Sequence, residues 1–123
     1  MSLIVYKTAP GRDAYVIFRT EDDVPLCMGD RAEISDRLCM EIPPAIVDEL
    51  MDRADRTGTT YNDGTGGWDD TGFMVGENMF PTDVGSRFLP RANLEEFVRA
   101  AATQDMERMV ALTTEMLESG EAR

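Results

Sequence analysis

The chemical groups that this chain could bring to a site are concentrated in one glycine-rich stretch, residues 57–81. Of the ten glycines in the chain, six lie there, together with the only tryptophan, Trp68. The same stretch contains four acidic residues: Asp63, Asp69, Asp70 and Glu77. Glycine-rich loops bind phosphate through backbone N–H groups, and carboxylate oxygens bind calcium or magnesium. The spacing of these residues must therefore be tested against phosphate binding and against divalent-metal binding.

The residues of this stretch do not have the spacing of any known motif for phosphate binding or for divalent-metal binding. A phosphate loop needs a Lys-Ser or Lys-Thr pair after its last glycine, and no lysine lies near this stretch. A dinucleotide fingerprint has glycine at its first, third and sixth positions; Gly64 and Gly66 fit, but the sixth residue is Asp69. No frame fits an EF-hand. An irregular calcium site made by Asp63, Asp69 and Asp70 stays open, because oxygen ligands can be gathered loosely. We therefore assign no cofactor and no metal ligand.

Catalytic groups are scarce in the rest of the chain. The chain has no histidine, which removes the Ser-His-acid and Cys-His nucleophile systems and the commonest general base. The two cysteines, Cys27 and Cys39, cannot complete a structural zinc site by themselves. A pair of carboxylates can hydrolyse glycosides, but nothing marks one pair among so many. We assign no catalytic residue, and a carboxylate enzyme with a divalent metal remains an alternative.

Negative charge is the clearest property of the sequence. The chain has 24 acidic and 12 basic residues, and its formal net charge is −12. Nucleic-acid backbones and anionic membranes are bound by basic residues that displace counterions, so both are disfavoured as partners. A basic surface on another protein is favoured, because complementary charge accelerates encounter. The alternative is that the charge serves solubility alone.

One helix, 44–56, is well defined by its pattern and would carry part of this charge. Pro44 suits the first helical position, and Gly58 follows the end as a C-cap glycine does. The apolar stripe contains Ile46, Val47, Leu50, Met51 and Ala54. The other side carries Asp48, Glu49, Asp52 and Asp55.

Two of these acids have an arginine four residues later, which favours the ion pairs Glu49–Arg53 and Asp52–Arg56. Asp48 and Asp55 have no such partner on the helix. In the glycine-rich stretch, Asp63-Gly64 predicts a hairpin turn. Trp68 is of a type enriched at binding hot spots, although the loop could instead lie on the surface with its aromatic residues packed into the core. The candidate partner-binding residues are Asp48, Asp52, Asp55, Asp63, Trp68, Asp69 and Asp70.

The remaining elements predict an α+β protein with a small antiparallel sheet of three to five strands and about three helices, two of them C-terminal. Strands are expected at 3–7, 14–19, 24–28, 37–42 and 73–75. Residues 82–90 read as a connection. Asn93 is expected to cap a helix in a capping box with Glu96; from there to residue 119 the pattern allows one helix or two. We expect one domain, 1–123, with 57–81 as an acidic, glycine-rich loop.

The segments of the chain do not indicate a membrane protein. No window approaches 18 consecutive apolar residues, and the N-terminus lacks the features of a signal peptide. Two cysteines are too few for a disulfide framework and are expected to be reduced. We therefore expect a cytoplasmic protein.

Together these features favour a small acidic protein-binding module that inhibits or masks a basic surface on a partner, with a nucleic-acid-binding protein as one candidate. Small inhibitors of phages or mobile elements, including anti-CRISPR proteins and nucleic-acid mimics, have this size and charge. The alternatives are a toxin immunity protein, the metal-dependent enzyme, and a structural or assembly subunit in which the apolar residues of 93–119 form an oligomer seam. The sequence leaves the oligomeric state open.

Overall fold

The computed structural model describes residues 3–63, 65–80 and 85–115 and confirms the α+β class. The strands form two three-stranded antiparallel sheets, β1-β2-β3 and β4-β5-β6, rather than one sheet. In chain order the elements are β1 (Leu3–Lys7), β2 (Tyr15–Arg19), β3 (Val24–Gly29), α1 (Arg31–Leu38), α2 (Pro44–Thr57), β4 (Gly72–Val75), η1 (Glu77–Met79), β5 (Arg87–Pro90), η2 (Arg91–Asn93), α3 (Leu94–Ala102), α4 (Met106–Ala111) and β6 (Thr114–Glu115).

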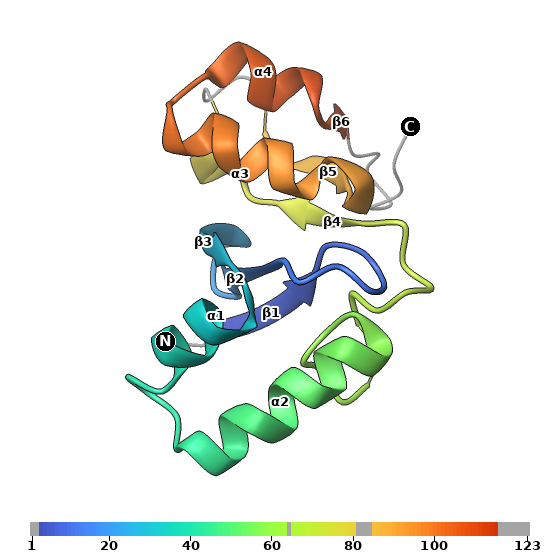
Figure 1. The fold of residues 1–123 in the computed structure, drawn as a ribbon. Helices are drawn as coiled ribbons and strands as arrows, with labels where there is room; N and C mark the ends of the chain where they lie inside the picture. Colours follow the sequence, from blue (N-terminus) through green and yellow to red (C-terminus); the bar gives the residue numbers. More distant parts are fainter. Residues whose placement is uncertain (1–2, 64, 81–84, 116–123) are drawn as a thin grey trace.

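The first sheet lies in the middle of the molecule and is buried on both faces. Helices α1 and α2 lie on one side of it, and the second sheet with α3 and α4 lies on the other (Figure 1). Because side chains alternate along a strand, each strand contributes to two cores. Val5 and Ile17 pack with α1 and α2, whereas Ile4 and Phe18 pack toward the second sheet and α3. Strand β1, which is apolar from Leu3 to Tyr6, has the continuous apolar character that a sheet covered on both faces requires.

The strand expected at 37–42 is wrong, because helix α1 occupies residues 31–38. Its start is fixed by a capping box: Asp30 Oδ1 accepts from Glu33 N at 2.9 Å, and Glu33 Oε1 accepts from Asp30 N at 3.2 Å. Ile34 and Leu38, four residues apart, point into the core. The apolar residues that alternate over 37–42 do not share one buried face, since the Met40 side chain is 77% exposed.

The helix expected at 44–56 is confirmed as α2, with Pro44 at its start and Gly58 (φ 90°) as its left-handed C-cap. The expected ion pairs along the helix are wrong. Arg53 Nη1 donates to the Thr60 carbonyl at 2.8 Å, and Asp52 pairs with Arg31 of α1 at 2.8 Å. Tertiary partners therefore displace the pairing within the helix.

The C-terminal region forms two helices, because the chain turns at Gln104, whose φ is 57°. The expected capping box at Asn93 is wrong: the Asn93 side chain makes no cap bond and donates instead to the Leu112 carbonyl at 2.9 Å, which joins the start of α3 to the end of α4. The strand at 73–75 is confirmed within β4, and part of the expected connection 82–90 is strand β5. Residues 116–119 lie outside the described residues.

Candidate functional site

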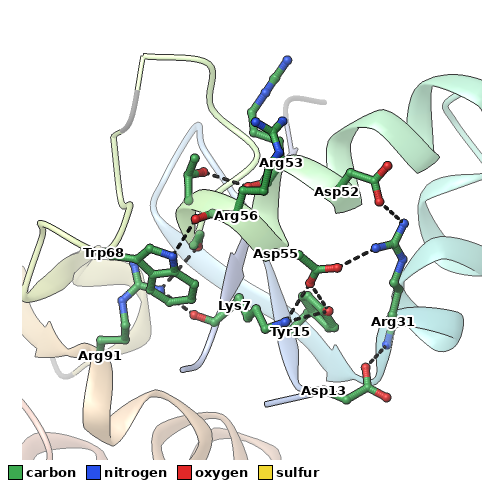
Figure 2. Close-up of polar contacts among 12 residues, drawn as sticks. Lys7, Asp13, Tyr15, Arg31, Asp52, Arg53, Asp55, Arg56, Trp68 and Arg91 are labelled. Atoms are coloured by element: carbon green, nitrogen blue, oxygen red, sulfur yellow. Dashed lines mark hydrogen bonds and ion pairs between the residues drawn. The ribbon is translucent and has the colours of Figure 1, made fainter. Parts of the chain in front are cut away.

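The glycine loop, defined here as residues 58–70, is organised by one arginine that follows β5. The guanidinium of Arg91 donates through Nη2 to the carbonyls of Gly66 and Gly67, the latter at 3.0 Å. Through Nη1 it donates to the carbonyls of Lys7 and Gly58. The loop, β1 and the end of α2 are thus joined by a single side chain (Figure 2).

Aromatic rings cover this guanidinium on two sides. The Arg91 Cζ lies 4.8 Å from the Trp68 ring centroid and 4.9 Å from that of Phe73, distances at which cation–π attraction operates. Trp68 is half-buried, and its Nε1 donates to the Arg56 carbonyl at the end of α2 at 2.9 Å. Burial lowers the pKa of Arg91 from its ordinary value. Trp68 therefore has a structural role in holding the loop.

The acids of the glycine loop differ in the hydrogen bonds that they accept. Asp63 Oδ1 accepts from Thr65 N at 2.9 Å, and this bond lowers the pKa of Asp63. Asp70 Oδ2 accepts from Gly66 N at 2.7 Å. Asp69 is exposed. The turn expected at Asp63-Gly64 includes Gly64, which lies outside the described residues; among the residues described on either side, no paired strands flank it. The described residues also contain no group of three acids or cysteines that could hold a metal ion.

A second polar cluster connects α2 with β1, β2 and α1 and contains Asp55 (Figure 2). Asp55 Oδ1 accepts from Lys7 Nζ at 2.7 Å and from the Tyr15 hydroxyl. Asp55 Oδ2 accepts from Arg31 Nη1 at 2.6 Å, and the Arg31 backbone N–H donates to Asp13 at 2.9 Å. As expected, Asp55 has no basic partner within α2; its basic partners, Lys7 and Arg31, come from β1 and α1.

The cluster is balanced electrically. Burial alone would raise the pKa of Asp55, but the hydrogen bonds from Lys7 and Tyr15 outweigh it and the pKa falls below its ordinary value. Burial would lower the pKa of Lys7, yet its bond to Asp55 raises it. Lys7 itself is buried. A buried lysine needs such a partner, so this cluster stabilises the packing of α2 on the sheet.

The outer face of α1, α2 and the turn between them, which we call the acidic face, carries a different set of acids. Six acidic side chains are exposed there: Glu33, Asp36, Glu41, Asp48, Glu49 and Asp52. Arg56 is the one exposed basic side chain of this layer. Asp48 and Glu49 form no ion pair with any described residue, whereas Asp52 remains 67% exposed although it contacts Arg31.

Most basic side chains of the described residues have a partner within the molecule, although several of them remain exposed. Six pair with acids: Lys7, Arg12, Arg19, Arg31, Arg99 and Arg108. Three more, Arg53, Arg87 and Arg91, donate to backbone carbonyls. The negative charge left over is therefore presented to solvent, and on the acidic face it is concentrated along two packed helices.

Of the seven candidate partner-binding residues, Asp48, Asp52 and Asp55 follow one another at helical spacing along α2. Trp68 lies beside Arg91 at the C-terminal end of that helix, close to Asp55 (Figure 2). Sequence reasoning missed Arg31 and Arg91, which no motif surrounds. Their roles arise from acceptors on segments distant in the sequence. The one signal in the sequence was the position of the single lysine, Lys7, in an apolar strand, because a lysine there needs an acidic partner.

The chain was compared with protein-family models, curated proteins and solved structures, and none of them matches. None of the described helices combines the length and the apolar character needed to cross a membrane.

Proposed function

We propose that this protein is a cytoplasmic binding module whose acidic face engages and masks a basic surface on a partner protein. The observation that carries the proposal is the separation of charge: described basic side chains are largely paired within the fold, whereas Asp48 and Glu49 face solvent without a cation. Exposed like charges on adjacent helices produce a local negative potential that attracts a basic partner and accelerates association. Both cysteines are free, as in a reducing compartment.

The candidate residues take different parts in this proposal. Asp48 and Asp52 belong to the acidic face, with Glu49 and Asp36 as further contacts, because all four are exposed. Asp55 contributes indirectly by holding α2 against β1 and α1. The loop residues Asp63, Trp68, Asp69 and Asp70 lie beyond the C-terminal end of α2 and would contact only a partner that extends past it. A nucleic-acid-binding protein is a suitable partner, since such proteins expose basic surfaces.

The proposal can be tested by pull-down from lysate of the native host at low and high salt, followed by identification of retained proteins by mass spectrometry. We expect a basic protein that is retained at low salt and lost at high salt. Affinity for it should fall roughly 3- to 10-fold in Asp48→Lys. The matched control is Glu107→Lys, which makes the same charge change at an exposed position of α4. If both variants lost affinity for the partner equally, the effect would come from net charge alone, and a specific role of the acidic face would be refuted.

A further inference from the structure

A groove lies between the edge of the first sheet and α3, on a part of the molecule separate from the acidic face. Its volume is about 460 Å³. It is lined by the following residues: Pro25, Leu26, Cys27, Met28, Met79, Val98, Arg99, Ala101 and Ala102. All but Arg99 are apolar or small. Methionine side chains adapt to irregular partners, so this lining suits apolar side chains of more than one shape.

The two edges of the first sheet are treated differently. The β1 edge is covered by the chain after α2: Lys7 N donates to the Gly58 carbonyl at 3.0 Å and Thr60 N to the Val5 carbonyl at 3.1 Å. The β3 edge has no such cover, because in the described residues no backbone hydrogen bond joins Val24–Gly29 to anything but β2. An open edge presents backbone donors and acceptors to an incoming chain.

Only part of the β3 edge is suitable for pairing. Pro25 has no N–H to donate, and a register shift interrupts the β2–β3 ladder next to it. The regular pairs Cys27–Ile17 and Met28–Val16 lie beyond this shift. An incoming chain could therefore pair over a few residues only, and its side chains in the groove would have to supply most of the contact.

Arg99 gives the groove its chemical preference. Its side chain is 61% exposed, and its one ion pair within the described part of the chain, to Glu95 Oε1, is long at 3.4 Å. Glu95 is already held by Arg12, whose Nη2 donates to that same oxygen at 2.8 Å. Arg99 is thus a weakly neutralised cation at the rim of an apolar groove, in a chain of net charge −12.

We propose that this groove binds a short extended segment of another protein, with apolar side chains in the groove and an aspartate or glutamate facing Arg99. A planar guanidinium with free donors is well suited to a carboxylate. This site is independent of the proposed function, because it lies on another face and prefers the opposite charge. A second copy of the chain fits poorly: a symmetric contact would place one groove against the other, and the groove lining contains no acid that could face Arg99.

The first test uses a phage-displayed library of random dodecapeptides as the probe. We expect selected peptides to combine alternating apolar residues with an aspartate or glutamate, and a synthetic peptide of that sequence to bind in solution. Its affinity should fall about 10-fold or more in Arg99→Glu, where attraction becomes repulsion, and in Ala102→Trp, which fills the groove. Arg108→Glu is the matched control: it makes the same charge change on α4 outside the groove and should alter affinity less than about 2-fold.

The second test needs no variant, because the two cysteines provide an internal comparison. Cys27 is one of the β3 residues that line the groove, and its side chain packs against the core beneath α1 and α2, so a chain paired along β3 would restrict access to its thiol. Cys39 is exposed after the end of α1. Burial raises the pKa of the Cys27 thiol, so alkylation with iodoacetamide is followed at pH 8.5. The bound peptide should slow alkylation of Cys27 and leave that of Cys39 unchanged.

Four results would overturn the proposal. The first is a selection that yields basic peptides or none above background, and the second is peptide binding that survives Ala102→Trp. The third is alkylation of Cys27 that the peptide does not slow. The fourth is a wild-type dimer that Ala102→Trp dissociates, which would make a second copy the occupant. None of them bears on the acidic face, whose test depends on Asp48. Failure of one proposal is therefore distinguishable from failure of the other.

Discussion

Replacing Arg91 by alanine should destabilise the protein and release the glycine loop. The side chain supplies donors to carbonyls on three segments and lies against two aromatic rings. Gly58 O would keep its bond from Lys7 N, but the carbonyls of Lys7, Gly66 and Gly67 would lose Arg91 as their donor. Arg91→Ala therefore tests whether this one side chain accounts for the order of the loop.

The size of the effect follows from these lost contacts. Three hydrogen bonds from a charged donor contribute about 1.5–3 kcal/mol each, and the ring contacts contribute roughly 0.5–2 kcal/mol. Water that reaches the freed carbonyls offsets about half of this loss, which leaves about 3–4 kcal/mol. Domains of this kind unfold with only about 5–15 kcal/mol. At about 4 °C per kcal/mol the Tm should fall by roughly 12–16 °C.

The assay is thermal unfolding followed by circular dichroism, with tryptophan fluorescence as a local readout. Trp68 is the only tryptophan and lies against Arg91, so release of the loop should shift its emission to the red before global unfolding. Arg91→Lys should fall between the wild type and Arg91→Ala, because an ammonium group cannot reach acceptors on three segments. Arg56→Ala is the control and should change stability by less than about 0.5 kcal/mol. A Tm within 2 °C of the wild type, with unchanged emission, would refute the role given to Arg91.

Two further predictions concern the same region and the cluster beside it. Gly66→Ala and Gly11→Ala replace glycines of similar φ, +77° and +76°, but a Cβ at Gly66 would collide with the Tyr6 ring, whereas Gly11 has nothing within 4 Å. Denaturant unfolding should show that Gly66→Ala costs about 1–3 kcal/mol more; equal losses would contradict the packing described. Because the pKa of Asp55 is lowered by folding, its contribution is present above its unfolded pKa and is lost as the pH falls through its folded pKa. The unfolding free energy of Asp55→Asn should therefore depend less on pH below about 4 than that of the wild type, and parallel profiles would show that Asp55 is not coupled to folding.

Local patterns predicted the parts of the fold that depend on neighbours in the sequence. Helix α2 was predicted from proline at its start, glycine after its end and an apolar stripe between them. The strand pattern of 37–42 failed because a capping box upstream, Asp30 with Glu33, set the start of a helix instead. Capping needs only two residues three apart, and alternation over six residues does not outweigh it.

The candidate site was less accessible from the sequence, because its charges are assigned by tertiary partners. Asp48 and Asp55 look equivalent on a helical projection, yet one faces solvent and the other meets Lys7, Tyr15 and Arg31. Nothing near Arg91 indicates that it binds carbonyls of a loop more than twenty residues earlier. An acidic sequence predicts that negative charge is exposed, but not which acids remain free.

The arginine that holds the glycine loop also bears on the order in which the protein folds. Its acceptors, at Lys7, Gly58, Gly66 and Gly67, are separated from it by 24 to 84 positions. Contacts across such separations close large loops and form only after the chain is already compact. The contacts of Arg91 are therefore expected to form after the folding transition state, and interactions of that kind slow unfolding more than they speed folding. The lifetime of the folded protein, more than its rate of formation, depends on this side chain.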